Sequence, residues 1–301
     1  MSKGILPAAM AYVLWGFLPV YFKLIYDVPA LQTTAHRVVW SFLLLVAIVA
    51  FRHEYNALRA NLNRRTVLIY LGAATLLAAN WLIYIYAVKA GFVVETSLGY
   101  FINPLVNVLL GMIFLRERLR SAQWVPVALA ALGVAYLTFS VGSLPTIALA
   151  LAFTFGFYGL VKKVAPLGSL HGLMLETSLM LIPATAYLIY EEASGVGVFG
   201  HAGPGVSILL VLLGGVTAVP LLLFASGARQ VPLSTLGLLQ YIAPTLQFLT
   251  GVLLYGEPFT RDRMIGFGII WVALAIFSAE GLLARRRAIQ AAEADLPVMG
   301  R

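Results

Sequence analysis

The sequence predicts an all-α integral membrane protein with ten transmembrane helices, arranged as two inverted five-helix repeats, with both termini cytoplasmic. Of its 301 residues, 61% are hydrophobic and only 11% are charged, whereas soluble domains carry about 25% charged residues. A membrane-spanning helix needs about 20 mostly apolar residues. The apolar content therefore suffices for about eight to ten spans and excludes a large soluble domain.

Ten apolar blocks follow one another along the chain. They lack the alternation that barrel strands show over about ten residues, which favours helices. The first block is longer than the roughly 7–15 apolar residues of a signal-peptide core, so we expect it to remain as the first span. Pro29 and Pro232 suit a first helical turn, and Ser121 and Ser169 suit N-cap positions. The predicted spans are 4–26, 29–52, 66–88, 93–115, 122–140, 144–162, 169–190, 206–227, 231–255 and 262–284.

The distribution of positive charge predicts the orientation. If the N-terminus is inside, fifteen of the twenty Lys and Arg residues fall on the cytoplasmic side, as the positive-inside rule requires. The acidic pair Glu191 and Glu192 falls outside, whereas Arg261 and Arg263 lie outside against the rule. The balance predicts an even number of spans, and it accounts for the net charge of +8 without a nucleic-acid partner.

An internal repeat appears when the chain is shifted against itself by 140 residues. Each half holds five spans, an odd number, so the two halves cross the membrane in opposite senses. Inverted repeats of this kind are typical of secondary transporters, whose site lies near the midplane between the halves; the alternative is a duplication that retains no transport role. We expect repeats at 1–140 and 141–284 and a cytoplasmic tail at 285–301. The clearest matched series is Pro104, Gly111 and Glu117 with Pro244, Gly251 and Glu257.

Six ungapped stretches carry a resemblance to a known family. The chain resembles the RarD-type proteins of the EamA group, within the drug/metabolite transporter superfamily, over nearly its whole length. The resemblance implies a carrier in the cytoplasmic membrane, with ten helices in two inverted repeats and a substrate that is generally unassigned in the family. The stretches are AYVLWGFLPVYFK (11–23), AHRVVWS (35–41), NWLIYIYAV (80–88), ETSLGYFINPLVNVLLG (95–111), FGFYGLVKK (155–163) and PLSTLGLLQYIAPTLQFLTGVLLYGEPF (232–259).

Cationic side chains in the first two spans are candidates for substrate binding. His36 and Arg37 lie about eight residues, or roughly 12 Å, into the second span, where charged groups are costly and usually functional. Trp40 lies one turn further along, so we expect a cationic clamp for an anionic group with an aromatic wall. The alternative is an Arg37 that snorkels to the headgroups, with Asp27 as partner. Lys23 either faces the cavity or snorkels outward.

Glu176 is the candidate coupling residue. It is the counterpart of His36 under the 140-residue shift. At that depth an unpaired carboxyl would favour its protonated form, as proton coupling requires, and His36 itself titrates near neutral pH. The alternative is an internal ion pair of Glu176 with Lys162 or Lys163, although a loop charge is the simpler reading of Lys163.

Polar stripes on three further spans complete the predicted site. Because residues three, four or seven apart share a helix face, we expect these groups to line a central cavity; the alternative is hydrogen bonding between helices. Interior prolines tend to kink helices, which suits a carrier that must bend. The predicted substrate-binding residues are Asn80, Trp81, Tyr84, Tyr100, Asn103, Asn107, Gln240, Tyr241 and Gln247, and the predicted kinks are Pro104 and Pro244.

Two carboxylates lie at the ends of the spans that carry these prolines. Glu117 and Glu257 end the fourth and ninth spans, where a negative charge opposes the helix dipole. We therefore expect partners such as Arg118 and Arg263, and a structural or gating role.

The leading function is a secondary transporter that exports a small metabolite or amphipathic compound by alternating access, with possible proton coupling as a separate hypothesis. We expect no cofactor, no metal and no enzymatic activity, because the chain has no cysteine and no HExxH motif or nucleophile–base constellation. An intramembrane enzyme and a channel are the alternatives. The expected partners are a small-molecule substrate and the lipid bilayer, and the expected state is a monomer or homodimer.

Overall fold

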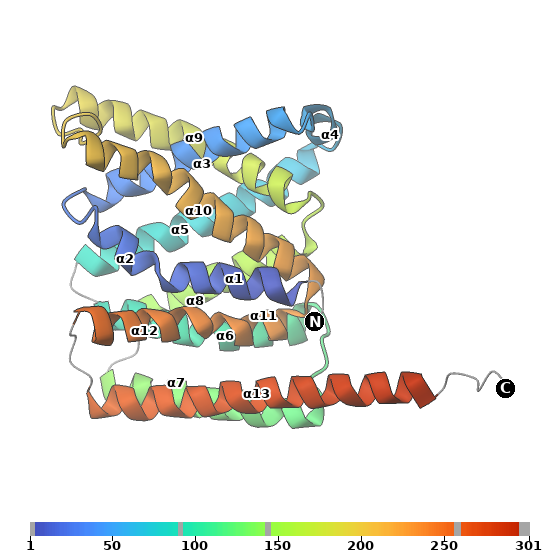
Figure 1. Ribbon diagram of the computed structural model, residues 1–301. Helices are drawn as coiled ribbons and strands as arrows, with labels where there is room; N and C mark the ends of the chain where they lie inside the picture. The colour runs from blue at the N-terminus through green and yellow to red at the C-terminus, as the bar shows by residue number, and fades with distance from the viewer. Residues whose placement is uncertain (1–3, 90–92, 142–145, 256–259, 295–301) are drawn as a thin grey trace. The chain divides into compact units, whose positions relative to one another are not determined.

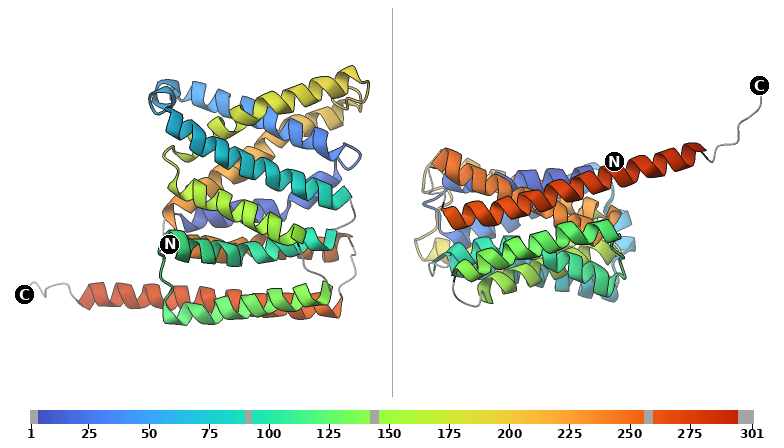
Figure 2. Two further views of the ribbon diagram at one scale, coloured as in Figure 1. Left: turned by 180° about the vertical axis from the view of Figure 1, so that it is seen from behind. Right: turned by 90° about the horizontal axis from the view of Figure 1, so that it is seen from below.

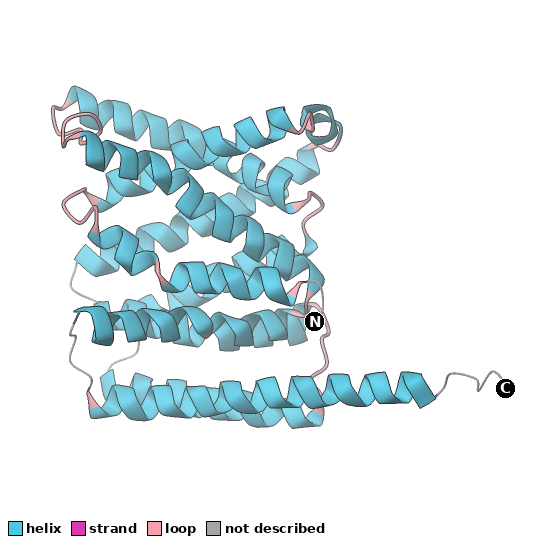
Figure 3. Ribbon diagram, viewed as in Figure 1, coloured by secondary structure: helices cyan, strands magenta, loops and turns pink. Residues whose placement is uncertain are grey.

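The computed structural model describes residues 4–89, 93–141, 146–255 and 260–294. Within these residues all regular secondary structure is helical (Figure 3). The elements are α1 (Ile5–Gly16), α2 (Leu18–Lys23), α3 (Ala30–Phe51), α4 (Tyr55–Ala60), α5 (Arg64–Lys89), α6 (Val93–Phe114), η1 (Ser121–Gln123), α7 (Trp124–Val141), α8 (Thr146–Val164), α9 (Ser169–Ala193), α10 (Pro204–Gln230), α11 (Leu233–Gln240), α12 (Ile242–Tyr255) and α13 (Arg261–Ala294).

Every predicted span has a helical counterpart. Among the described residues, nine helical stretches are long and apolar enough to cross a membrane, and Gly99–Phe114 within α6 is a shorter apolar helix. The short helix α4 connects α3 to α5 and was not predicted. The last helix, α13, continues beyond the predicted span to Ala294. The chain is therefore built as a multi-pass membrane protein.

Two of the predicted spans are interrupted helices. The first span is divided between α1 and α2 at Phe17, two residues before Pro19. The ninth is divided between α11 and α12 at Tyr241, three residues before Pro244. A proline removes one backbone donor and its ring crowds the preceding turn, so a break shortly before each proline is expected. By contrast, α6 runs continuously through Pro104.

The chain divides into two compact units. Unit 1 comprises Met1–Glu117 and Pro145–Pro258, and unit 2 comprises Arg118–Leu144 and Phe259–Arg301. In unit 2, α7 and α13 lie side by side (Figures 1 and 2). A Cβ added to Gly133 of α7 would lie 3.2 Å from the carbonyl oxygen of Gly266, so small residues allow the two backbones to approach closely.

Unit 1 contains the helices that carry the candidate site residues. Helix α1 packs on α10, and α8 packs on α5. Helix α3 packs on both α9 and α10, and α6 packs on both α8 and α11 (Figure 1). At the contact of α3 with α10, a Cβ on Gly214 would lie 2.6 Å from the carbonyl oxygen of Trp40. Close contacts of this kind fix the helices that surround Arg37.

Candidate functional site

Arg37 lies where four elements of unit 1 meet. Its Nε donates a hydrogen bond of 3.0 Å to the hydroxyl of Thr217 on α10. Its guanidinium lies over the ring of Trp81 on α5, 4.4 Å from the centroid, and 5.7 Å from the ring centroid of Phe22 on α2. A cation within about 6 Å of an aromatic ring is attracted by it, so these rings hold the charge in place while Arg37 remains half-buried.

Two tyrosines extend this aromatic environment. The rings of Tyr84 on α5 and Tyr100 on α6 lie 6.1 Å apart, and Tyr84 lies three residues after Trp81 on the same face of α5. Tyr84 keeps 36% of its surface exposed. We define the Arg37 cluster by the residues that surround and include this cation: Phe22, Arg37, Trp81, Tyr84, Tyr100 and Thr217.

His36 and Trp40 face away from this cluster. The indole N–H of Trp40 donates to Nδ1 of His36 at 3.3 Å, and both rings contact Phe199, with centroids 5.3 and 5.6 Å away. Adjacent residues on a helix do not face the same side, which separates His36 from Arg37. The aromatic wall expected from Trp40 is supplied by Trp81, a residue that was predicted as a separate part of the site.

Glu176 forms an ion pair inside unit 1. Its Oε1 lies 2.7 Å from Nζ of Lys162, and its Oε2 accepts a hydrogen bond of 3.1 Å from the hydroxyl of Tyr158. Lys162 also lies over the rings of Tyr70 and Tyr158, at 5.4 and 5.8 Å. Glu176 has 0% of its side-chain surface exposed, and Lys162 has 3% exposed. Of the two partners considered for Glu176, the structure selects Lys162.

The amides of α6 and α11 bind one another. Asn107 donates to Oδ1 of Asn103 at 3.1 Å and to Oε1 of Gln240 at 2.8 Å. Asn103 in turn donates to the carbonyl of Ala152 on α8 at 2.7 Å. All three amides are buried, with at most 5% exposed. In this conformation they connect three helices, which is the interhelical alternative to cavity lining.

The remaining polar candidates also make contacts between helices. Asn80 donates to the Leu151 carbonyl and to the Thr154 hydroxyl on α8, both at 2.9 Å. Gln247 on α12 donates to the carbonyl of Trp15 on α1 at 3.0 Å. The buried Tyr241 hydroxyl donates to the carbonyl of Phe101 at 3.2 Å.

Lys23 and Asp27 lie near the C-terminal end of the first predicted span. Lys23 is exposed at the end of α2, and Asp27 is exposed in the turn that follows. The described residues include no ion pair between Asp27 and Arg37. The pairing with Asp27, which belonged to the alternative of a snorkelling Arg37, is therefore not found among the described residues.

The partners of Glu117 differ from those that the sequence led us to expect. Its carboxylate accepts the backbone N–H groups of Leu233 and Ser234 at 2.6 and 3.0 Å and the Ser234 hydroxyl at 2.9 Å. It thereby caps α11, where the helix dipole favours a negative charge. Lys163 lies 3.9 Å from Glu117 and also binds the carbonyl of Val231. Glu257 and the side chain of Arg263 lie outside the described residues.

Sequence reasoning missed two parts of this arrangement. Thr217 gives no signal in the sequence, because a single Thr in an apolar span is common. An aromatic cluster between α1, α8 and α10 was also missed, although Trp15 and Phe155 are equivalent under the 140-residue shift and their rings lie 5.8 Å apart. The cluster consists of Tyr12, Trp15, Phe155, Tyr158 and Phe224.

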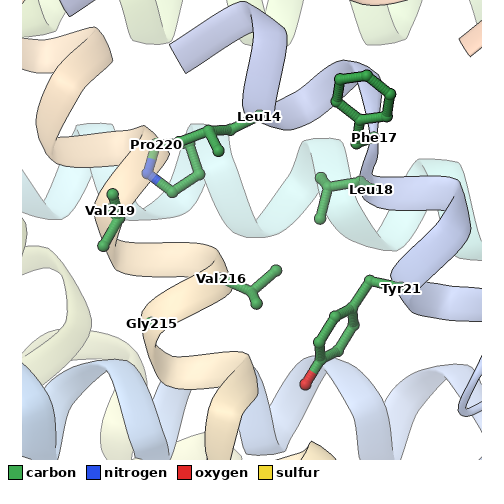
Figure 4. Close-up of a pocket in the computed structure, with 8 residues that line it drawn as sticks. All are labelled: Leu14, Phe17, Leu18, Tyr21, Gly215, Val216, Val219 and Pro220. Carbon is green, nitrogen blue, oxygen red and sulfur yellow. The ribbon is translucent and has the colours of Figure 1, made fainter. Parts of the chain in front are cut away.

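A separate pocket of about 330 Å³ lies between α1, α2 and α10 (Figure 4). Its walls are apolar apart from the hydroxyl of Tyr21, which donates to the carbonyl of Leu209 at 2.5 Å. None of the predicted site residues lines it. The lining residues are Leu14, Phe17, Leu18, Tyr21, Gly215, Val216, Val219 and Pro220.

Comparisons with known proteins identify the family. The EamA-like transporter family matches residues 2–139. An uncharacterized transporter of Vibrio cholerae is 46% identical over 291 residues, 96% of each chain, and Protein RarD of Escherichia coli is 45% identical over 95% of this chain and 97% of its own. A crystal structure with 21% identity shares the fold, with a TM-score of 0.70 over 94% of this chain and 99% of that chain. The chain therefore belongs to the RarD-type proteins of the EamA-like transporter family.

Proposed function

We propose that this protein is a secondary transporter of the cytoplasmic membrane, which exports a small metabolite or amphipathic compound by alternating access. Family membership supports the transport activity. The observation that carries the assignment of a site is the Arg37 cluster, because it places a half-buried cation and four aromatic rings from α2, α3, α5 and α6 within one membrane-embedded region. Intramembrane charges typically mark substrate pathways.

The alternating-access mechanism rests on two inverted repeats, residues 1–140 and 141–284, with both termini in the cytoplasm. Two contacts support a two-fold relation between them. Trp15 packs against Phe155, and Tyr241 packs against Phe101 with ring centroids 6.5 Å apart. In each pair the two residues are 140 positions apart, so each residue contacts its own equivalent, as happens near a two-fold axis. Rocking of two such halves about a central site is the usual transport movement of inverted-repeat carriers.

Proton coupling in this proposal uses Glu176. Protonation of this carboxylate would remove the negative charge that pairs with Lys162 and would break the ion pair between α8 and α9. His36, the equivalent of Glu176 in the first repeat, is a second candidate, and protonation of its Nδ1 would break the hydrogen bond that Nδ1 accepts from Trp40. Transport in proteoliposomes that is insensitive to an imposed pH gradient would remove this part of the proposal.

The test is paired metabolite profiling of medium and cytosol in cells that express the wild type or Arg37→Ala at equal levels. We expect at least one compound to move outward with the wild type. The Arg37→Ala variant should export this compound at least about tenfold less, because the variant loses a charged hydrogen-bond donor worth about 1.5–3 kcal/mol.

The matched control is Arg52→Ala, which removes the same charge from an exposed side chain paired with Glu54. It should export as the wild type does. A compound that moves inward would reverse the proposed direction. If no compound moves although the protein is inserted in the membrane, the proposal of an exporter fails.

A further inference from the structure

Among the described residues of unit 1, Arg37 and Lys162 both lie over aromatic rings, and the two differ in their counter-charge. Lys162 lies over Tyr70 and Tyr158, and Arg37 lies over Trp81 and Phe22. Charged side chains within a membrane are costly and almost always pair with an opposite charge or face a water-filled cavity. The two sites can therefore be compared by asking what neutralises each cation.

Lys162 has its counter-charge within the protein. The Glu176 carboxylate lies 2.7 Å from its Nζ, and neither side chain has more than 3% of its surface exposed. The pair is neutral as a whole and is closed to any ligand. This site is complete without a bound molecule.

Arg37 has no such partner among the described residues. The hydroxyl of Thr217 binds its Nε, and the other neighbours are aromatic rings and phenols that carry no negative charge at neutral pH. No carboxylate lies within ion-pair distance of Arg37 in the described part of the chain. Within the part of the chain that the structure describes, the hydrogen bond to Thr217 uses only Nε, which leaves the two terminal nitrogens for a second partner.

We propose that the cargo supplies a counter-charge to Arg37, and that it is an organic monoanion. Its carboxylate binds the terminal nitrogens of Arg37 in the bidentate geometry that guanidinium groups favour, and its apolar or aromatic body packs against Trp81, Tyr84 and Tyr100. One guanidinium neutralises one negative charge, so a monoanion leaves the site neutral. This inference rests on the proposed function, since it names the substrate class of the same site.

The test uses three probes that share one apolar body and differ in charge: 3-phenylpropionate, 3-phenylpropionamide and 3-phenylpropylamine. Thermal unfolding of the purified full chain is followed by intrinsic fluorescence in phosphatidylcholine nanodiscs. A ligand that binds only the folded state raises the unfolding temperature, and the rise grows with the logarithm of the ligand concentration divided by Kd. We expect stabilisation by the carboxylate and none by the amide or the amine.

Variants show whether Arg37 is responsible. Arg37→Gln should weaken carboxylate binding about tenfold to a hundredfold, as loss of charged hydrogen bonds predicts. Arg37→Lys keeps the charge and should retain the preference for the carboxylate with lower affinity, so the test survives if Arg37→Gln does not fold. Arg52→Gln, which removes an exposed charge, should bind as the wild type does.

Three results would overturn the proposal. They are equal stabilisation by the amide or amine, carboxylate binding that persists in Arg37→Gln, and no stabilisation by any member of a wider panel of aromatic and aliphatic monocarboxylates. Nanodiscs that contain phosphatidylglycerol address the lipid as an alternative source of the anion. If that lipid stabilises the protein through Arg37 and carboxylates add nothing, the anion is a headgroup and the proposal of an anionic cargo is wrong.

The same probes in proteoliposomes separate this inference from the proposed function. If 3-phenylpropionate binds through Arg37 but neither it nor any binding relative crosses the membrane, the anion site stands and the transporter proposal fails. If a neutral or cationic compound is transported without dependence on Arg37, the transporter proposal stands and the anionic substrate class fails.

Discussion

Glu176 illustrates how the partner of a residue changes its role. Its depth in the membrane was predicted from the sequence, and it is buried completely. Its partner Lys162 lies 14 residues away on a different helix, and Tyr158 satisfies its second oxygen. The carboxylate is therefore a fixed half of an ion pair in this conformation, and a coupling role requires that pair to open.

Removal of either member of the pair should destabilise the protein strongly. Glu176→Gln and Lys162→Met should each cost about 3–5 kcal/mol, because each leaves one buried charge without compensation. The double variant should cost clearly less than the sum of the two single variants. Thermal or denaturant unfolding in detergent micelles measures all three.

A second double-mutant cycle on Arg52 and Glu54 provides the control. That pair has 60% and 28% of its side-chain surface exposed, and exposed pairs contribute about 0–1 kcal/mol. Strictly additive costs for Glu176 and Lys162 would mean that the two charges do not depend on each other.

The candidate residues divide into two groups that the sequence alone does not distinguish. Arg37, Trp81, Tyr84 and Tyr100 come together as predicted members of one site. The amides on α6 and α11 were expected to line the same cavity, but they bind one another and the backbone of α8. Periodicity identifies which residues share a face, whereas the partner of that face depends on packing. Whether the amides also line the pathway in another conformation stays a prediction.

The contact between α6 and α11 is tight because α11 carries a glycine there. A Cβ on Gly237 would lie 2.5 Å from the carbonyl oxygen of Pro104 and 2.9 Å from Cβ of Asn107. The close approach brings Gln240 within hydrogen-bond distance of Asn107. The carboxylate of Glu117 caps the start of the same helix. Helix α11 is thus held at its N-terminus and along its side.

Gly237→Ala should lower stability by about 1–3 kcal/mol, because the added methyl group must displace backbone atoms in a packed interface. The measurement is the unfolding temperature of the purified protein in detergent. The transport rate should fall together with this temperature. Gly72→Ala is the matched control, since α5 offers open space around Gly72 with no atom within 4 Å of the added carbon.

Alanine at Gly72 should be neutral or stabilising by up to about 1 kcal/mol, given the lower helix propensity of glycine. If Gly237→Ala were as stable as Gly72→Ala, helices α6 and α11 would not be in close contact in the membrane.

If the N-terminus is cytoplasmic and the chain has ten spans, fifteen of its twenty Lys and Arg residues fall on the cytoplasmic side. An even number of spans would place both termini on that side. These features lead to a direct topological prediction.

Single cysteines should report the orientation without background, because the chain has none of its own. Arg59→Cys lies in α4 between α3 and α5, and Ser194→Cys lies at the end of α9; both positions are exposed. A membrane-impermeant maleimide added to intact cells should label Ser194→Cys and leave Arg59→Cys unlabelled, as the positive-inside rule predicts.

Both positions should react after the membrane is permeabilised, which controls for access of the reagent. Labelling of Arg59→Cys in intact cells would invert the topology. Equal labelling of both positions would contradict an odd number of spans between them.

Hydropathy and span length were sufficient to locate the helices that span the membrane, and six ungapped stretches of sequence carried the resemblance to the family. These are local properties of the chain, and the cost of placing polar groups in lipid leaves little choice of fold. The pairing of the polar residues was settled by packing. Arg37 and Thr217 are 180 residues apart, and Asn107 and Gln240 are 133 apart. Only the folded arrangement of helices brings such groups together, and it alone separates Lys162, which pairs with Glu176, from Arg37, which has no carboxylate partner among the described residues.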